Sequence, residues 1–161
     1  MTRWVAAQGG IVAGEKLHRA QSLYERLDLP GVASSASSVF VLNTSEPCAW
    51  SWPSGEVFLS VGLIDGMTDD EICAAIAHEM GHLISDGHLA SSRSLRGSAH
   101  TGGLAEEKQA DALGIQLLIA KGIPPQAMIS MLTKLANDPS TGPAGQKALL
   151  HRAEFLKIAH H

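Results

Sequence analysis

The feature that most constrains the fold is a pair of histidines, four residues apart, inside an apolar run. Residues 74–88 read AAIAHEMGHLISDGH and contain His78, Glu79 and His82. A helix advances about 100° per residue, so the two histidines lie about 40° apart on one helix face. The large apolar residues fall on the opposite arc, whereas small residues surround the histidines. This run therefore predicts a helix whose back packs into a core and whose front presents two close imidazoles.

Length and composition favour one domain, residues 1–161, with a substantial core. The chain has 161 residues, of which 45% are hydrophobic. A net charge of −4 and the lack of a dense basic stretch argue against nucleic acid as a partner. Apolar runs such as residues 115–120 are far shorter than the roughly 20 residues that cross a bilayer. We therefore expect no transmembrane segment and a soluble chain.

The N-terminus and the cysteines bear on location. Residues 8–10, Gln-Gly-Gly, interrupt the first apolar segment, which is too weak a pattern for a secretory leader, so we expect a cytoplasmic protein. Cys48 and Cys73 fit neither a disulfide framework nor a Cys-x-x-Cys metal site. Both cysteines are interpreted as buried thiols.

Periodicity and turn formers divide the chain into helices around a small sheet. Helical spacing over 14–27 predicts an N-terminal helix, and three short β-branched or aromatic runs predict about three strands. A capping box at Thr68–Glu71 predicts the start of the histidine helix. The expected segments are an N-terminal helix within 1–30, a sheet within 38–62, the histidine helix over 69–86, a loop or lid over 88–103, a glutamate helix over 104–121, and C-terminal helices over 125–159.

The spacing HExxH at residues 78–82 has a chemical explanation. Two imidazoles at this spacing hold a zinc ion, and the intervening Glu79 serves as general base. The alternative is a pair of ordinary core histidines. A capped helix with both histidines opposite the apolar arc favours the metal site. Other divalent ions also accept imidazole and carboxylate ligands, but the pattern favours one zinc ion per chain.

A catalytic zinc needs a third protein ligand and leaves a fourth position for water. Glu107 shares a helix face with the small residues Ala110 and Gly114, which can approach the small residues around the histidines. We therefore predict Glu107 as the third ligand. Asp111, one turn later, is predicted to accept an N–H from a ligand histidine. The side chains considered for the third position were Asp86, His88, His100, Glu106, Glu107 and Asp111.

The motif HExxH followed by ExxAD at residues 107–111 resembles the zinc peptidase family of CAAX prenyl endopeptidases and HtpX heat-shock proteases, which are gluzincins. Flanking stretches such as SGEVFLSVGLI and EKQADALGIQLLIAKGIPPQAMISML look similar too, so the resemblance covers about residues 43–132. It implies an α+β, zincin-like metallopeptidase core that is mostly helical, with the histidine helix packed on the glutamate helix. It also implies that an edge strand binds substrate backbone by strand addition, here Val57, Phe58, Leu59 and Ser60.

The chain departs from that family in two respects. Family members that work in membranes carry transmembrane helices, so this chain resembles the soluble, minimal members. The family often has a His-Pro and a downstream Arg after the glutamate helix, where residues 141–148 here read TGPAGQKA. No oxyanion-stabilising residue carries over directly. His151 or Arg152 could substitute, although His151 fits a surface position equally well.

The pattern as a whole predicts a zinc-dependent endopeptidase acting on a peptide or an unfolded protein. Zinc would acidify a water and polarise the scissile carbonyl, and Glu79 would carry the proton to the leaving amine. A second interpretation is a latent or non-proteolytic zinc-stabilised binding module, with His88 or His100 blocking the fourth position. A third is another zinc hydrolase, such as a deamidase, although the ExxAD context favours a peptidase.

Overall fold

The computed structural model describes residues 2–27, 38–52, 54–85 and 103–159, and the structural statements below concern these residues. They are mostly helical with one three-stranded sheet, which confirms the expected α+β class. The elements in chain order are α1 Thr2–Ala7, α2 Glu15–Leu27, β1 Val39–Leu42, β2 Ala49–Ser51, β3 Val57–Ser60, α3 Val61–Gly66, α4 Asp69–Ser85, α5 Leu104–Ala120, α6 Gln126–Ala136 and α7 Pro143–Ala159.

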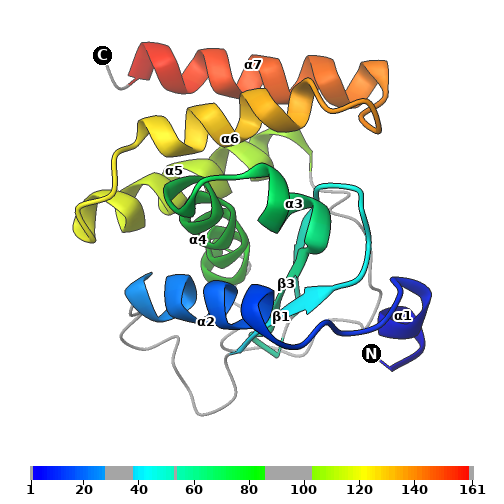
Figure 1. Ribbon diagram of the computed structural model, residues 1–161. Helices are drawn as coiled ribbons and strands as arrows, with labels where there is room; N and C mark the ends of the chain where they lie inside the picture. Colours follow the sequence, from blue (N-terminus) through cyan, green and yellow to red (C-terminus); the bar gives the residue numbers. More distant parts are fainter. Residues whose placement is uncertain (1, 28–37, 53, 86–102, 160–161) are drawn as a thin grey trace.

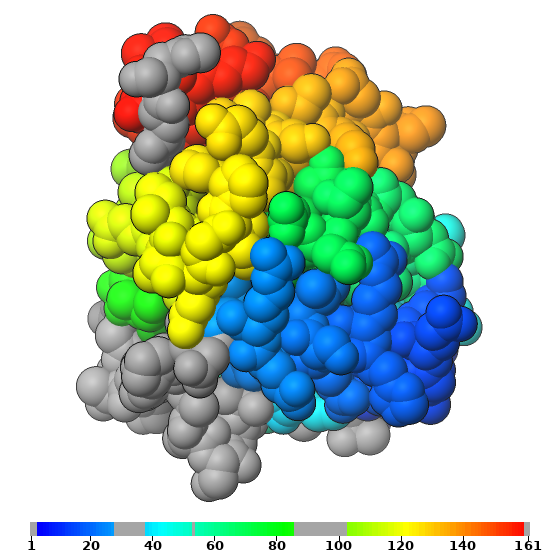
Figure 2. Space-filling model, turned by 60° about the vertical axis from the view of Figure 1, so that its left-hand side comes forward, coloured from blue at the N-terminus to red at the C-terminus, as the bar shows by residue number. Residues whose placement is uncertain are grey.

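Helix α4 is the central element of the fold. It lies between α2 on one side and α6 with α7 on the other, beside the sheet (Figure 1). It packs against α5, α6, α2 and β2. The whole run from Glu71 to Leu83 is buried, so α4 is enclosed on all sides rather than amphipathic. Figure 2 shows part of this enclosure, with the surface of α2 below that of α6 and α7 at the top.

The predicted capping box sets the start of α4. The Glu71 N–H donates to Thr68 Oγ1 at 3.3 Å, and the Thr68 N–H donates to Glu71 Oε2 at 2.7 Å. Lys134 of α6 donates to the same Glu71 oxygen at 2.7 Å. Burial alone would raise the pKa of Glu71, but these bonds and one from Ser130 lower it to about 2. This carboxylate therefore joins the first turn of α4 to α6.

The sheet has the strand order β1-β3-β2, and this order corrects one expectation. Val57–Ser60, predicted as the edge strand that binds substrate, is the central strand: β1 pairs with it in parallel and β2 in antiparallel orientation. All four of its residues, Val57, Phe58, Leu59 and Ser60, are buried. Both edges of β3 are already bonded, so no peptide can add to it. Strand β2 is at the edge of the sheet.

An aromatic cluster on the sheet explains α1, a helix that the sequence analysis did not predict. The ring of Trp4 in α1 lies 5.4 Å from Trp50, 5.6 Å from Trp52 and 5.2 Å from Phe58, with edge-to-face angles. Such pairs stabilise beyond the burial of apolar area, and they attach a six-residue helix to the sheet. The two tryptophans therefore pack against Phe58 of the sheet and Trp4 of α1.

Two other helix bounds differ from expectation for local reasons. The end of the run expected as the third strand forms α3 because the Ser60 side chain accepts the Leu63 N–H at 3.0 Å, which is an N-cap bond. Within the region expected to hold C-terminal helices, residues 125–159, helix α7 begins at Pro143 because proline suits a first helical position. Cys73 is buried as expected, whereas Cys48 is only half-buried.

No helix in the described parts of the chain is both long enough and apolar enough to span a membrane.

Candidate metal centre

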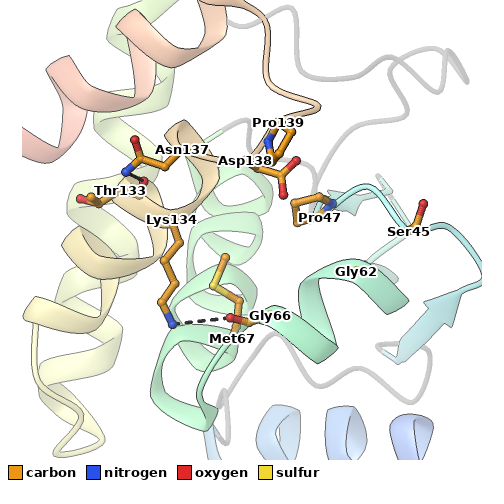
Figure 3. A pocket seen from close by; sticks show the side chains of 10 residues that line it. All are labelled: Ser45, Pro47, Gly62, Gly66, Met67, Thr133, Lys134, Asn137, Asp138 and Pro139. Atoms are coloured by element: carbon orange, nitrogen blue, oxygen red, sulfur yellow. Dashed lines mark hydrogen bonds between the residues drawn. The ribbon is translucent and has the colours of Figure 1, made fainter.

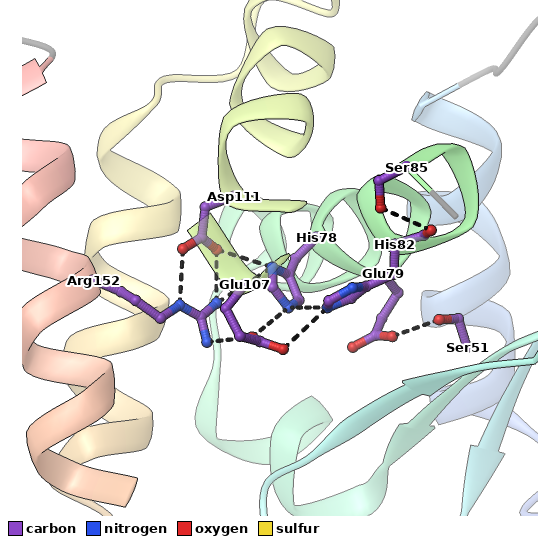
Figure 4. A network of polar contacts seen from close by, with 8 residues as sticks. All are labelled: Ser51, His78, Glu79, His82, Ser85, Glu107, Asp111 and Arg152. Atoms are coloured by element: carbon purple, nitrogen blue, oxygen red, sulfur yellow. Dashed lines mark hydrogen bonds and ion pairs between the residues drawn. The ribbon is translucent and has the colours of Figure 1, made fainter. Parts of the chain in front are cut away.

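Two helices bring three potential metal ligands together. His78 and His82 come from α4 and Glu107 from α5, and one donor atom of each lies within 4.8 Å of the other two. His78 Nε2 is 3.1 Å from His82 Nε2 and 3.4 Å from Glu107 Oε2. His82 Nε2 is 3.4 Å from Glu107 Oε1. Figure 4 shows the three side chains pointing toward one another.

Small residues allow α4 and α5 to approach closely enough for this cluster. A Cβ added to Gly81 would lie 2.4 Å from the carbonyl oxygen of Ala110, which is a backbone atom. A Cβ added to Gly114 would lie 3.1 Å from the backbone of Ala77. The contact at Gly81 is closer than real Cβ atoms show, and the contact at Gly114 is tighter than most, so glycine allows the close helix separation at both points. The expected meeting of small residues around the histidines is therefore present.

The three side chains fit a zinc ion by both spacing and chemistry. With metal–donor distances of about 2.0–2.1 Å, the donors of a tetrahedral zinc lie about 3.3 Å apart. The His78–His82 separation of 3.1 Å is close to this spacing, and the two imidazole nitrogens each lie 3.4 Å from a different oxygen of Glu107. Glu107 Oε1 is buried and has no hydrogen-bond partner among the described residues. A buried carboxylate oxygen that lacks a hydrogen bond and lies 3.4 Å from Nε2 of His82 is an arrangement that a cation would stabilise.

Asp111 and Arg152 lie at the outer side of the cluster, in contact with His78 and Glu107. Asp111 Oδ1 lies 2.9 Å from His78 Nδ1, the ring nitrogen opposite the one that faces the cluster. Arg152 of α7 donates to both oxygens of Asp111 at 2.8 and 2.7 Å. It also donates to Glu107 Oε2 at 2.6 Å. A carboxylate on the remote nitrogen of a ligand histidine is the usual means of fixing its ring.

The charges of this network shift the pKa values of its members. Burial alone would lower the pKa of His78, but the hydrogen bonds with Asp111 and Glu107 raise it to about 9. Burial alone would raise the pKa of Glu107, but the two histidines and Arg152 hold it well below its usual value. The pKa of Asp111 is lowered by Arg152 and His78 in the same way. A metal ion that binds His78 therefore displaces a proton.

Arg152 has a different place from the one proposed for it. Its guanidinium lies in the network, and the Nε, Nη1 and Nη2 groups are all bonded to Asp111 and Glu107. It therefore holds two carboxylates, which is a different role from the stabilisation of an oxyanion. The neighbouring His151 is exposed on α7. Arg152 precedes the apolar Leu156 by four residues, a helical spacing that could have placed both on the buried face of α7, but the partners of Arg152 are set by tertiary packing.

Glu79 lies on the sheet side of the cluster. Its side chain is 3% exposed, and its Oε2 accepts a hydrogen bond of 2.8 Å from the hydroxyl of Ser51 in β2. The sequence analysis did not single out Ser51. Figure 4 shows Glu79 between the histidines and this edge strand.

Of the remaining candidates, only Glu106 lies among the described residues, and it does not join the cluster. Glu106 is exposed on α5, as expected for a side chain about 100° away from Glu107. Asp86, His88 and His100 lie outside the described residues, as does the expected loop apart from Gly103.

A second concavity involves none of these side chains. It is an open hollow of about 350 Å³ between α3, the segment before β2 and the C-terminal end of α6 (Figure 3). Its cation, Lys134, is already bonded to Glu71 and approaches the carbonyl of Gly66. The hollow offers no converging set of free polar groups, so we assign the chemistry to the histidine–glutamate cluster.

Comparison with known proteins agrees with this assignment. The family model for peptidase family M48 matches residues 16–104, just over half of the chain. The matched segment contains α2, the sheet, α3 and α4 with both histidines and Glu79. Glu107, Asp111 and Arg152 lie beyond it. Comparison with curated proteins returns no match.

Proposed function

The chain belongs to peptidase family M48, and on that basis we propose that it is a zinc-dependent endopeptidase with Glu79 as general base. Membership of the family implies zinc metallopeptidase activity toward peptides or proteins. The observation that carries the finer proposal is the convergence of His78, His82 and Glu107 within 4.8 Å, with Glu79 beside them.

His78, His82 and Glu107 would hold one zinc ion, which supplies Lewis acidity: it acidifies water and polarises a carbonyl group. Asp111 keeps the ring of His78 oriented, with the remote nitrogen bonded and the other nitrogen directed at the centre. Arg152 holds Glu107 Oε2, and the other oxygen, Oε1, faces Nε2 of His82. These contacts keep the donors in place in a site that is largely shielded from solvent.

Glu79 performs the proton transfers of the proposed reaction. It accepts a proton from the attacking water as the water oxygen bonds to the scissile carbonyl carbon, and it delivers that proton to the nitrogen as the C–N bond breaks. Its low exposure strengthens electrostatic interactions around the reacting groups. No covalent intermediate with the protein is needed.

We assign the peptide-binding edge to β2 instead of β3. The Trp52 N–H donates to Glu56, and Cys48 accepts from the Ser60 N–H, each at 2.9 Å, so these residues face β3. In an antiparallel pair the alternate residues face the opposite edge, so the backbone groups of Ala49 and Ser51 point outward. A substrate strand could add there, beside Glu79.

The test is zinc content and cleavage of denatured casein by wild type and Glu79→Gln. The expected result is one zinc per chain in both and cleavage by wild type alone, because the substitution removes the base but no ligand. Glu106→Gln, an exposed change of the same kind on α5, is the matched control and should cleave like wild type.

Two results would contradict the proposal. Zinc in both proteins without cleavage by either would support the latent or non-proteolytic module. Equal cleavage by wild type and Glu79→Gln would remove Glu79 from the mechanism. Glu107→Gln should lower zinc content, since it replaces the anionic ligand by a neutral amide.

A further inference from the structure

The side chain of Ser51, in the edge strand β2, reaches the proposed general base. Its hydroxyl donates to Glu79 Oε2 at 2.8 Å across 28 positions of sequence. Both residues are shielded, Glu79 being 3% exposed and Ser51 half-buried. A hydrogen bond from a neutral donor to a carboxylate in such surroundings is stronger than the same bond in water.

The geometry of β2 gives Ser51 a second property. Its side chain points across the sheet toward α4, while its backbone N–H and C=O point outward, because Cys48 and Trp52 make the bonds to β3. No described strand pairs with this outer edge. Ser51 is therefore at once part of the free edge and a partner of Glu79.

A glutamate needs such a partner to be oriented. The terminal torsion of a glutamate side chain has a broad energy profile, so its own rotamer leaves the carboxylate plane poorly defined. A hydrogen bond from Ser51 to Oε2 defines that plane.

We propose that Ser51 is a positioning residue, whose hydroxyl fixes the orientation of the Glu79 carboxylate beside the edge of β2. This inference rests on the proposed function and extends it. A peptide that pairs with the backbone of Ser51 meets a base that the side chain of Ser51 has already oriented. Because the backbone of residue 51 binds and its side chain orients, substitution of the side chain should change kcat and leave KM nearly constant.

The experiment compares wild type, Ser51→Ala, Ser51→Thr and Ser54→Ala in steady-state cleavage of a fluorogenic peptide. Ser51→Ala should lower kcat about tenfold with KM within about twofold, since misplacement of a reacting group slows the step more than it weakens binding. Ser51→Thr keeps a hydroxyl on a strand position and should recover most of kcat. Ser54→Ala is the matched control, because Ser54 also donates to a carboxylate, that of Glu56, but is exposed in the same hairpin.

Zinc content and crystal structures of the zinc-loaded proteins provide readouts apart from activity. All four proteins should contain equal zinc, and the Glu79 carboxylate should be rotated or spread over several orientations in Ser51→Ala alone. Unchanged kcat with an unmoved carboxylate in Ser51→Ala would overturn the positioning role, as would equal losses of kcat in Ser51→Ala and Ser51→Thr. Wild type that cleaves no better than Glu79→Gln would instead overturn the proposed function, and this inference with it.

Discussion

Replacing Arg152 by methionine should strongly destabilise the metal-free protein. Arg152 is 8% exposed at its side chain, and it makes three charge-assisted hydrogen bonds of 2.6, 2.7 and 2.8 Å to carboxylates that are themselves 16% and 1% exposed. Methionine keeps length and apolar contact but removes the charge. Asp111 and Glu107 would then share His78 as their remaining cation in the described network, its pKa of about 9 keeping it protonated at neutral pH.

The expected loss follows from the cost of leaving a buried charge unpaired. Breaking a buried ion pair by removing one partner costs about 3–5 kcal/mol. The unfolding entropy of a chain of 161 residues is about 0.34 kcal/mol per degree, at about 2.1 cal/mol/K per residue. Arg152→Met should therefore lower Tm by roughly 9–15 °C.

The assay is thermal and urea unfolding after metal removal with a chelator. Lys157→Met on the same helix is the matched control, because Lys157 pairs with Glu154 at 3.3 Å on the surface and should change stability by less than about 0.5 kcal/mol. Arg152→Met combined with Asp111→Asn should lose less than the sum of the two single variants, since the unpaired carboxylate is then absent. A loss below about 1 kcal/mol for Arg152→Met would refute the reasoning that these charges are buried and mutually dependent.

Two further predictions concern the helix that carries the histidines. The fold lowers the pKa of Glu71 from about 4.5 to about 2, so the ionised carboxylate stabilises the folded state at pH values above 4.5. This stabilisation is lost as the pH falls toward 2. Urea unfolding should therefore show Glu71→Gln less stable than wild type by up to about 3 kcal/mol at pH 5, with most of the difference gone by pH 2.5; a constant difference would contradict the pKa. Gly81→Ala should lower the free energy of unfolding by about 1–3 kcal/mol and lower the zinc content, because the added Cβ meets the backbone of α5. Gly66→Ala is the control: no atom lies within 4 Å of its added Cβ, so stability and zinc content should stay unchanged.

Local signals in the sequence predicted the parts of the site that depend on one or two helices. The capping box at Thr68, the histidine spacing and the small residues facing Glu107 all act within a helix or between two closely packed helices. Their physical causes are helix periodicity and steric size, which are readable from residue order. The structure accordingly brings His78, His82 and Glu107 together, as expected from those residues alone.

The parts that were missed depend on tertiary arrangement. Strand order was assigned wrongly because alternation and β propensity do not specify which edge of a strand is paired, and β3 is buried on both sides. Ser51 and Arg152 were overlooked as partners because each reaches the site from a separate element, β2 and α7. Helix α1 depends on aromatic contacts of Trp4 with the sheet. Its six residues are too few to show a helical periodicity in the sequence.

The position of Arg152 on α7 has a consequence for biosynthesis. On the ribosome, α4 and α5 are completed before α7, so a nascent chain contains His78, Glu107 and Asp111 before it contains the cation that joins them. Until α7 packs, burial of the Glu107 and Asp111 carboxylates is unfavourable because their cationic partner Arg152 is absent. The interface of α4 with α5 then lacks the contact with Arg152. The hydrogen-bond network around the candidate metal centre is therefore completed only after translation has passed residue 152.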